Sequence, residues 1–365
     1  MKRLSAIILN IVLAGCLCGC GVIKPAAAAP SASPSAQKDL SVSSVETYNR
    51  TGKIQKEEFY TVGDSGNAAV DYTVEYTYND SGQLTAVNRK GGGLGSNAPV
   101  ETCLYSGSNC TQRVVYDKNG STEKIWYWSY DKNGVLTKER IVSVIPSAGG
   151  KAGKAEEITE YNEDGTASLY TYSAENDYSK DEYGYDSLGR LITDNYYHSS
   201  DGKTFRFFET RLYSYDESGN LVKTQKRDSG GTVYFVEVCE VDPEGNILKA
   251  AAYSSPDMKE EEQLYQHLYE YGENGKLSFE ALYVDSDMTQ TYYEYDAAGN
   301  CTGVSVQKYR DGKAVDSSVT ETVYDAHSNQ LKETVKFGSA EARVNFVCEY
   351  EYYDDGAVKK IINYA

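Results

Sequence analysis

The string Tyr-[Asp/Asn]-x-x-Gly recurs along most of the chain, and this repeat limits the folds that the chain can adopt. Intact copies start at Tyr48, Tyr78, Tyr116, Tyr130, Tyr161, Tyr185, Tyr215 and Tyr295. Degenerate copies, in which one position is replaced or shifted, start at Val241, Tyr271, Tyr324 and Tyr352. The twelve copies are spaced by about 28 residues on average, and a period of about 20–50 residues is typical of repeat architectures. Each unit should therefore be one small supersecondary element.

The chemistry of the repeat predicts a tight hairpin turn. Asp or Asn at the first turn position can bind the backbone two residues on, and Gly three places later can adopt positive φ. Both features suit a type I turn followed by a G1 bulge, which forms a three-residue hairpin loop. We assign this role to the pairs Asp186 and Gly189, Asp216 and Gly219, and Asp296 and Gly299.

In such a loop the Tyr lies opposite the second residue after the Gly. That residue is aliphatic in eight of the twelve copies: Ile54, Leu84, Leu136, Leu191, Leu221, Ile247, Leu277 and Val358. Cross-strand pairs of an aromatic and an aliphatic side chain contribute about 0.2–1 kcal/mol each. The pattern therefore predicts both the turn and the register of the two strands that it joins.

A second aromatic residue often precedes the Tyr by two positions, as in Tyr76/Tyr78, Trp128/Tyr130, Tyr183/Tyr185 and Tyr293/Tyr295. A spacing of two places both rings on one face of a strand. The residues between them are mostly polar, which predicts a hydrated opposite face.

Second turn signals lie midway between the copies, at residues 64–67, 200–202, 228–231, 255–257 and 310–312. Each repeat should thus hold two strands and two turns. We expect an all-β fold with about two dozen strands in an antiparallel meander, forming one elongated sheet that strand twist coils or folds back on its tyrosine face. Residues 90–95 and 146–154 break the pattern, and we interpret both as long hairpin loops.

The N-terminus has the pattern of an exported lipoprotein. Lys2 and Arg3 precede a short apolar stretch, which predicts a signal peptide over residues 1–15. The string Leu-Ala-Gly-Cys at 13–16 resembles the bacterial lipobox and marks Cys16 for lipidation, with Cys20 as the alternative. Residues 16–43, rich in Ala, Pro and Ser, should be a spacer, and the repeat array should cover 44–365. The predicted location is extracytoplasmic, with the lipid anchored in a bacterial membrane.

The amino-acid composition limits the kinds of partner that the chain can bind. The chain holds 34 Tyr against 8 Phe and 2 Trp, together with 32 Gly, which favours strands and tight turns. A net charge of −18 argues against nucleic acid as a partner, while weak binding of divalent cations stays open. Five cysteines lie in the predicted array, at 103, 110, 239, 301 and 348. An odd number cannot all pair within one chain, although Cys103 and Cys110 could bridge a hairpin.

Two repeats carry a family resemblance. Residues 185–191 (YDSLGRL) and 215–221 (YDESGNL) resemble the YD repeat of Rhs and teneurin proteins, and the resemblance extends from about residue 48 to 356. It implies a long β-strip that spirals into a shell, often around a toxin or an adhesion payload. The sequence ends nine residues after Gly356, so we expect no payload at the C-terminus.

We find no pattern for catalysis, a cofactor or a metal site. The three histidines, His198, His267 and His327, have no ligand partner at useful spacing and should be ordinary strand and turn residues. The string at 131–134 lacks the rest of a calcium loop, and the glycines at 91–95 lack the ending of a phosphate loop.

Three non-enzymatic function hypotheses remain, beside an enzyme whose catalytic residues would have to be assembled across repeats. The first is a non-enzymatic surface lipoprotein whose sheet binds or scaffolds a protein or an envelope partner. The second is a glycan- or cell-wall-binding module, with Trp126, Tyr127 and Trp128 as candidate exposed contacts and Phe208 and Tyr292 as others that lie off the tyrosine face. The third, an accessory or immunity partner of a secreted toxin, follows from the resemblance alone.

Overall fold

The computed structural model describes residues 41–62, 68–92, 94–146 and 152–364. Cys16, Cys20 and the predicted leader lie outside the described residues, as do 63–67 and 147–151. The strands of the first half are β1 (Val42–Tyr48), β2 (Ile54–Val62), β3 (Ala68–Tyr78), β4 (Leu84–Gly91), β5 (Leu94–Ser106), β6 (Asn109–Tyr116), β7 (Thr122–Tyr130), β8 (Leu136–Pro146), β9 (Ala152–Tyr161), β10 (Ala167–Ala174), β11 (Asp177–Tyr185) and β12 (Leu191–Ser199).

The second half continues in the same way, with one turn of 3-10 helix, η1 (Glu260–Glu262), between two strands. Its strands are β13 (Arg206–Tyr215), β14 (Leu221–Asp228), β15 (Val233–Val241), β16 (Ile247–Tyr253), β17 (Gln263–Tyr271), β18 (Leu277–Val284), β19 (Asp287–Tyr295), β20 (Cys301–Arg310), β21 (Lys313–Tyr324), β22 (Gln330–Phe337), β23 (Arg343–Tyr352) and β24 (Val358–Tyr364).

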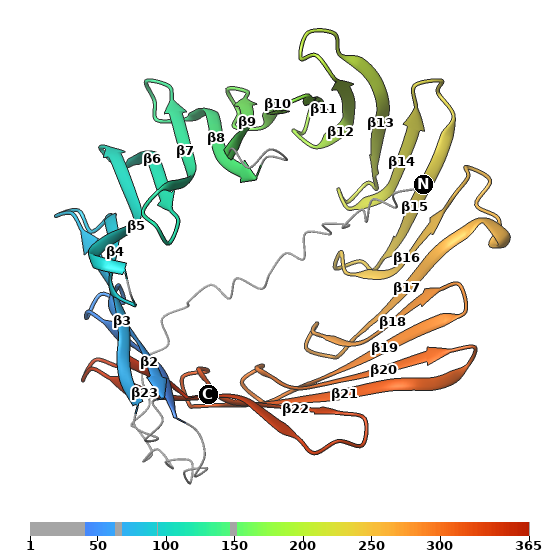
Figure 1. Ribbon diagram of the computed structural model, residues 1–365. Helices are drawn as coiled ribbons and strands as arrows, with labels where there is room; N and C mark the ends of the chain where they lie inside the picture. The colour runs from blue at the N-terminus through green and yellow to red at the C-terminus, as the bar shows by residue number, and fades with distance from the viewer. Residues whose placement is uncertain (1–40, 63–67, 93, 147–151, 365) are drawn as a thin grey trace.

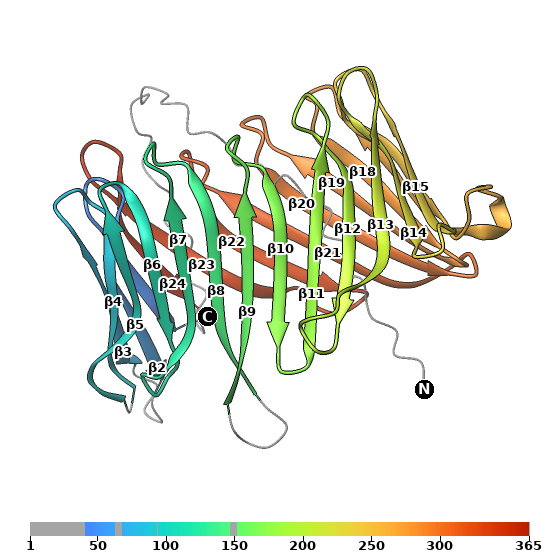
Figure 2. The ribbon, with the colours of Figure 1, turned by 90° about the horizontal axis from the view of Figure 1, so that it is seen from above.

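All 24 strands belong to one antiparallel sheet that closes on itself. Each strand pairs with the next along the chain, and β1 also pairs with β24, so the wall forms a barrel (Figures 1 and 2). The predicted antiparallel meander of about two dozen strands is confirmed. The prediction of an elongated, coiled or folded-back sheet is wrong, because pairing of the first and last strands removes both free edges.

The turn prediction holds in all twelve copies. In each copy, the N–H of the first turn residue donates to the carbonyl of the residue after the Gly position, as in Asp186 to Arg190 at 2.9 Å. The Gly189 N–H donates back to Asp186 at 3.0 Å, and the Asp186 carboxylate accepts the N–H groups of Leu188 and Arg190. The predicted register also holds, since Tyr185 faces Leu191. In every copy the register shifts by one residue directly before the tyrosine, or before Val241 in the copy that lacks it.

Eleven of the twelve repeat turns follow odd-numbered strands and therefore gather at one end of the barrel, which we call the tyrosine rim. It comprises residues 49–52, 79–82, 107–108, 131–134, 162–165, 186–189, 216–219, 242–245, 272–275, 296–299, 325–328 and 353–356. The opposite end is the far rim. The copy at Tyr116 is the exception, because only one strand, β7, separates it from the copy at Tyr130. Its turn therefore lies at the far rim.

The chirality of the residues fixes which face of the wall carries the tyrosines. Seen from outside, the strands follow one another from left to right, and β9 and β11 run upward to the tyrosine rim (Figure 2). Asn162 directs its N–H and C=O toward β10, so the preceding Tyr161 directs its own backbone groups away from β10, to the left. An L-residue with that orientation points its side chain away from the viewer. The tyrosine face therefore lines the interior.

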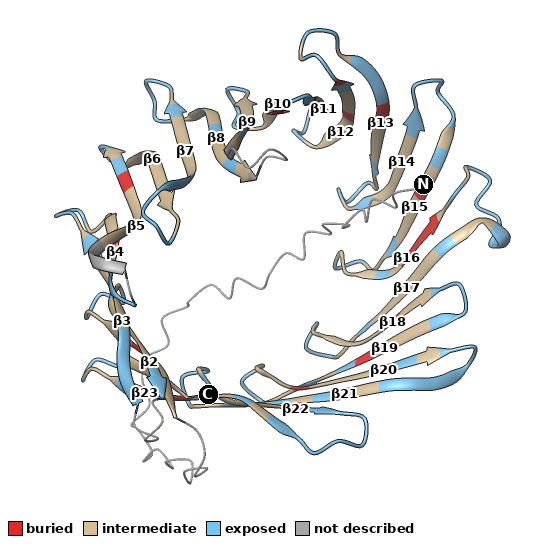
Figure 3. Ribbon diagram, in the orientation of Figure 1, coloured by how far each residue is buried: buried red, intermediate tan, exposed pale blue. Residues whose placement is uncertain are grey.

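The wall is one layer thick. The buried hydrophobic residues among those described are all Ala, Val or Cys, as in Ala252, Val236 and Cys103, and they occur as isolated segments rather than as a continuous core (Figure 3). Tyrosines of the repeat are half-buried, because neighbours on the same face cover them while no second sheet packs over them. Small side chains lie buried because large neighbours cover them.

Two loop predictions need correction. Residues 90–95 are not a long loop: β4 continues to Gly91 and β5 begins at Leu94, with Gly91 and Gly92 at positive φ. In the second segment, residues 152–154 already belong to β9. All five described cysteines are free thiols. Cys103 faces Arg113 and Cys110 faces Tyr105, so Cys103 and Cys110 are not opposite one another.

The seam between β1 and β24 carries its own side-chain bonds. Asn363 donates to Ser44 Oγ at 3.0 Å and to Glu46 at 3.2 Å, and it accepts from Cys348 Sγ at 3.0 Å. The Tyr353 hydroxyl donates to the carbonyl of Tyr48 at 2.8 Å. The contacts of Asn363 with β1 and of Tyr353 with Tyr48 join residues that lie more than 300 positions apart in the chain.

The turn geometry predicts opposite effects of two substitutions. Gly189 has φ of +77° with open space where a methyl group would stand, whereas Ser328 occupies the equivalent position at φ of +64°. Gly189→Ala should therefore lower the free energy of unfolding by about 1 kcal/mol, and Ser328→Gly should raise it by up to about 1 kcal/mol. Urea-induced unfolding of both variants checks this, and a loss of stability in Ser328→Gly would contradict it.

Loss of a hydrogen bond at the seam should destabilise the seam strands, β1 and β24, more than the rest of the wall. Tyr353→Phe removes one hydrogen bond across the seam, worth about 1 kcal/mol, and should speed amide hydrogen exchange in β1 and β24 by roughly fivefold. Tyr215→Phe, the matched control, removes an equivalent bond within the wall and should affect only β12 to β14. Equal acceleration around the whole barrel in both variants would show that the seam does not open separately.

Candidate binding surface inside the barrel

In six copies of the repeat, the tyrosine next to the turn joins its own repeat to the preceding one. Its hydroxyl donates to a backbone carbonyl of the preceding repeat. The acceptor is the first residue of the strand that follows the turn of that repeat: Tyr78 to Ile54 (2.7 Å), Tyr185 to Ala167 (2.7 Å), Tyr215 to Leu191 (2.8 Å), Tyr271 to Ile247 (3.1 Å), Tyr295 to Leu277 (2.9 Å) and Tyr324 to Cys301 (3.0 Å). Burial raises the pKa of Tyr215, so this phenol keeps its proton and remains a donor. Each of these bonds joins two successive repeats across a hairpin.

Deeper in the barrel, carboxylates share the inner face with the tyrosines. Ten of those that strand register places there form what we call the carboxylate belt: Glu46, Glu57, Glu101, Glu139, Glu157, Asp181, Asp194, Glu209, Glu237 and Glu280. Four of these have a cationic or histidine partner: Glu101, Asp194, Glu209 and Glu280.

The other six have no ion pair among the described residues. Five of them instead accept a hydrogen bond from an aromatic side chain: Glu46 from Tyr48, Glu57 from Tyr76, Glu139 from Trp128 (2.7 Å), Glu157 from Tyr170 (3.1 Å) and Glu237 from Tyr265. A phenol or indole donor satisfies a carboxylate oxygen without neutralising its charge. These five carboxylates therefore keep their negative charge.

The most crowded part of the belt lies on β11 to β13. Arg211 binds Asp194 at 3.0 Å and Glu209 at 2.9 Å, and Asp181 lies beside this cluster. Burial, and then the neighbouring charge of Asp194, raise the pKa of Asp181 to about 7. Asp194 is only 4% exposed, and its Oδ1 accepts no bond from any nitrogen or hydroxyl of the described chain. When Asp181 is protonated, its carboxyl group can donate to this oxygen.

His267 is part of a second inner cluster. Its Nε2 lies 3.1 Å from Glu280, its Nδ1 lies 2.8 Å from the Tyr269 hydroxyl, and Tyr293 also donates to Glu280 at 2.8 Å. Burial raises the pKa of Tyr269 to about 12, so this phenol stays protonated beside the imidazole. From the sequence, His267 was expected to be an ordinary strand residue, and this network was missed.

The outer face is different in kind. Cations and carboxylates pair directly along it, as in Lys56–Glu58 (2.7 Å), Lys90–Glu75 (2.6 Å), Lys138–Glu160 (3.2 Å) and Lys180–Glu182 (2.5 Å). These side chains are 26–47% exposed, so this face is in contact with water, and pairs of this kind contribute little to stability. The hydrated opposite face predicted from the sequence is therefore the outer wall.

The three candidate aromatic contacts do not form one surface. Trp126 and Trp128 point inward with the tyrosines, whereas Tyr127 points outward, and all three are half-buried rather than exposed. Arg113 and Lys124 lie over the Trp126 ring at 5.0 and 4.9 Å, which covers part of it. By contrast, Phe208 and Tyr292 are 60% and 45% exposed.

Sequence reasoning missed the belt because it assigned acidic residues to turns. The turn acids are where it placed them: Asp186, Asp216 and Asp296 each bind the backbone of their own turn. The belt was nevertheless marked by even spacing from the tyrosines, as in Glu46 before Tyr48 and Asp181 before Tyr183 and Tyr185. Period-two spacing placed these acids on the tyrosine face.

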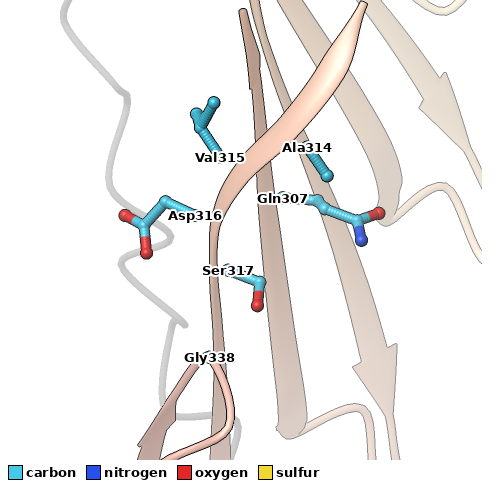
Figure 4. Close-up of a pocket in the computed structure, with 6 residues that line it drawn as sticks. All are labelled: Gln307, Ala314, Val315, Asp316, Ser317 and Gly338. Carbon is cyan, nitrogen blue, oxygen red and sulfur yellow. The ribbon is translucent and has the colours of Figure 1, made fainter.

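A small hollow of about 260 Å³ lies beside β20 and β21, lined by Gln307, Ala314, Val315, Asp316, Ser317 and Gly338. Figure 4 shows Val315 and Asp316 on one side of β21 and Gln307 and Ser317 on the other, as expected where a bulge interrupts the pairing. Lys308 already binds Asp316 at 3.2 Å, the one ionisable group of this lining. We assign this hollow to the bulge.

Comparisons with known proteins leave the family open. No protein-family model matches the chain, and no curated protein matches it, so the resemblance to YD repeats stays a prediction. Within the described residues there is no helix that is long and apolar enough to span a membrane. The described residues also hold no cluster of three or more His, Cys, Asp or Glu side chains arranged to bind a metal.

Solved structures include distant neighbours. The chain is similar to a TcdB2–TccC3–Cdc42 complex, at 11% identity over 88% of this chain and 25% of the other, with a TM-score of 0.22. It thus spans a quarter of that chain. It is also similar to porin-like proteins of Bacteroides uniformis (13% identity, 65% and 93% coverage, TM-score 0.29) and Bacteroides vulgatus (9%, 90% and 98%, 0.20). At these TM-scores, the fold and the site rest on the geometry of this chain alone.

The raised pKa of Asp181 predicts a pH-dependent stability. Protonated Asp181 contributes to the free energy of unfolding. This contribution is complete below the ordinary pKa of 3.8 and is lost as the pH rises through about 7. Asp181→Asn should therefore raise the thermal midpoint at pH 8 and have little effect at pH 4. A gain of about 1 kcal/mol corresponds to roughly 2–4 °C.

Asp216→Asn is the matched control. Hydrogen bonds from Asn220 hold the pKa of Asp216 below its ordinary value, so its stabilisation is present above that value and is lost at lower pH. This variant should lower the midpoint at pH 8. If Asp181→Asn also lowered the midpoint at pH 8, the raised pKa of Asp181 would be disproved.

Proposed function

We propose that this protein is a non-enzymatic binding protein of the bacterial cell envelope, whose barrel interior binds a basic polypeptide segment. The observation that carries the proposal is the belt of inner carboxylates that are held by phenol and indole donors instead of cations. Lys and Arg side chains supply the missing counter-charges, and the surrounding tyrosine rings add cation–π attraction. The outer wall, in contrast, already pairs its own charges.

The chemistry of the interior supports binding rather than catalysis. Burial raises the pKa values of the inner phenols Tyr76 and Tyr265, and it raises those of the thiols of Cys103 and Cys239 to about 11. Nucleophilic catalysis needs the opposite shift, toward a deprotonated phenolate or thiolate. His267 is engaged by Tyr269 and Glu280 together.

The N-terminal sequence supports the proposed location. The apolar leader and the string that ends at Cys16, with Cys20 as the alternative, support export and lipidation, and residues 16–43 would separate the barrel from the lipid. The water-exposed ion pairs of the outer wall fit a barrel that stands off the membrane surface.

Peptide binding to the purified chain tests the proposal. A labelled Lys- and Arg-rich decapeptide should bind saturably, more weakly as salt rises, while Glu-rich and neutral peptides of equal length should not bind. The combined variant Glu57→Gln, Glu139→Gln, Glu157→Gln and Glu237→Gln should weaken binding at least tenfold, or about 1.4 kcal/mol. Gln keeps an acceptor for each aromatic donor, so the wall should stay folded.

The control carries the same change of charge on the outer face. The combined variant Glu58→Gln, Glu75→Gln, Glu160→Gln and Glu182→Gln should bind the basic peptide with an affinity within about twofold of the unmodified chain. An equal loss of affinity in the outer-face variant would show that the peptide binds through the net negative charge of the protein and not through the interior. Absence of binding to the basic peptide would refute the interior as its site.

A further inference from the structure

The connection between β12 and β13 at the far rim is unusual in composition. Three of the eight phenylalanines of the chain lie within four residues, at Phe205, Phe207 and Phe208. They adjoin a cavity of about 500 Å³ whose lining includes Ser199, Asp201, Thr204, Arg206, Phe207 and Phe208. A volume of this size lies within the range of small-molecule sites, about 300–1,000 Å³.

The loop is held rigidly by its own hydrogen bonds. Ser199 is 2% exposed, and its hydroxyl donates to Asp201 at 2.8 Å and accepts the Gly202 N–H at 3.1 Å. Asp201 also accepts the N–H groups of Lys203 and Thr204, each at 2.9 Å, and these bonds lower the pKa of Asp201 to about 2. The Asp201 carboxylate is thus engaged within the loop, and the cavity is formed in advance of any ligand.

The two exposed phenyl rings are fixed in orientation. Phe208 contacts Tyr196 at 5.8 Å between ring centroids and Phe207 contacts Tyr197 at 5.5 Å, both in edge-to-face geometry. Phe208 nevertheless remains 60% exposed. Large apolar side chains that are held in place and exposed beside a cavity are typical of ligand-binding surfaces.

Two exposed cations lie at this site. The net charge of the protein is −18, yet Lys203 and Arg206 are exposed here, and Arg206 has no ion pair or hydrogen bond of its side chain within the described structure. Asp177 lies 3.2 Å from His198, so the histidine already has an acidic partner. Arg206 is therefore the group that can accept an anion.

We propose that this far-rim cavity binds a saccharide unit that carries an anionic group. The C–H face of the sugar ring would lie on Phe208, the anion would bind Arg206 in two-pronged fashion, and the hydroxyls of Ser200 and Thr204 would face the hydroxyls of the sugar. Carboxylated and sulfated sugars share this chemistry. The site lies at the far rim, where strand register places Arg206 opposite His198 on the inner face. It does not depend on the function proposed for the carboxylate belt.

Calorimetric titration of the full chain with three oligosaccharides tests the site. The probes are an oligogalacturonate, a sulfated chondroitin oligosaccharide and a neutral cello-oligosaccharide of similar length. At least one anionic probe should bind at least fivefold more tightly than the neutral probe, and the stronger of the two identifies the anionic group. Equal affinity for all three, or no saturable binding of any, overturns the proposal.

Variants locate the binding. Phe208→Ala should weaken every saccharide at least fivefold, whereas Arg206→Gln should remove the preference for the anionic probe and leave the neutral one unchanged. The controls are Phe337→Ala, which changes another exposed far-rim phenylalanine, and Arg343→Gln, which changes an exposed far-rim arginine. If the controls weaken binding as much as the site variants do, the assignment is wrong. The thermal midpoints of all four variants should equal that of the unmodified chain. Weaker binding then reflects a lost contact with the saccharide and not a loss of folded protein.

Discussion

Closure of the backbone ladder is the constraint on which the rest of this structure depends. A sheet one layer thick has no core behind it, so a free edge would leave a row of unpaired N–H and C=O groups at each end. Pairing of β1 with β24 satisfies both edges together. Because neighbouring strands alternate in direction, only an even number of strands closes with antiparallel pairing throughout, and the 24 strands meet this condition.

The size of the barrel explains why its tyrosines are neither a core nor a free surface patch. Barrels of about eight strands fill their interior with side chains, while barrels of about 16–18 strands leave a channel. With 24 strands, the inner side chains cannot meet across the axis, and each ring is covered only by its neighbours on the same wall. From the sequence, a core and an exposed ladder were the two alternatives. The tyrosines instead form a half-buried inner lining whose hydroxyls join successive repeats.

A feature could be predicted from the sequence when the residues that form it lie close together in the chain. Turn type, bulge and register were predictable because Asp186, Gly189 and Leu191 lie within a few residues of one another and act through the backbone. The alternation of faces was predictable for the same reason. Closure was not, because β1 and β24 lie more than 300 residues apart and meet only after the whole wall has turned.

The inner lining was beyond prediction for a related reason. Whether a face of a sheet points in or out is decided by the direction in which the wall closes, and no single hairpin carries that information. The copy at Tyr116 shows the same limit, since its motif is intact but the odd number of intervening strands sends its turn to the far rim. Local patterns placed Glu57 and Asp181 on the tyrosine face; closure made that face an enclosed surface.

That enclosure changes what the carboxylates can do. On an open sheet, water and salt would screen their charges over about 8 Å at physiological ionic strength. Inside a closed wall the charges of Glu57, Glu139, Glu157 and Glu237 face one shared space, and low-dielectric walls focus their field. Phenol and indole donors fix the orientation of each carboxylate while leaving its charge in place. A lysine in the same position would also have satisfied the carboxylate, but it would have removed its attraction for a further cation. The phenol and indole donors therefore leave the interior suited to the basic partner that we propose for it.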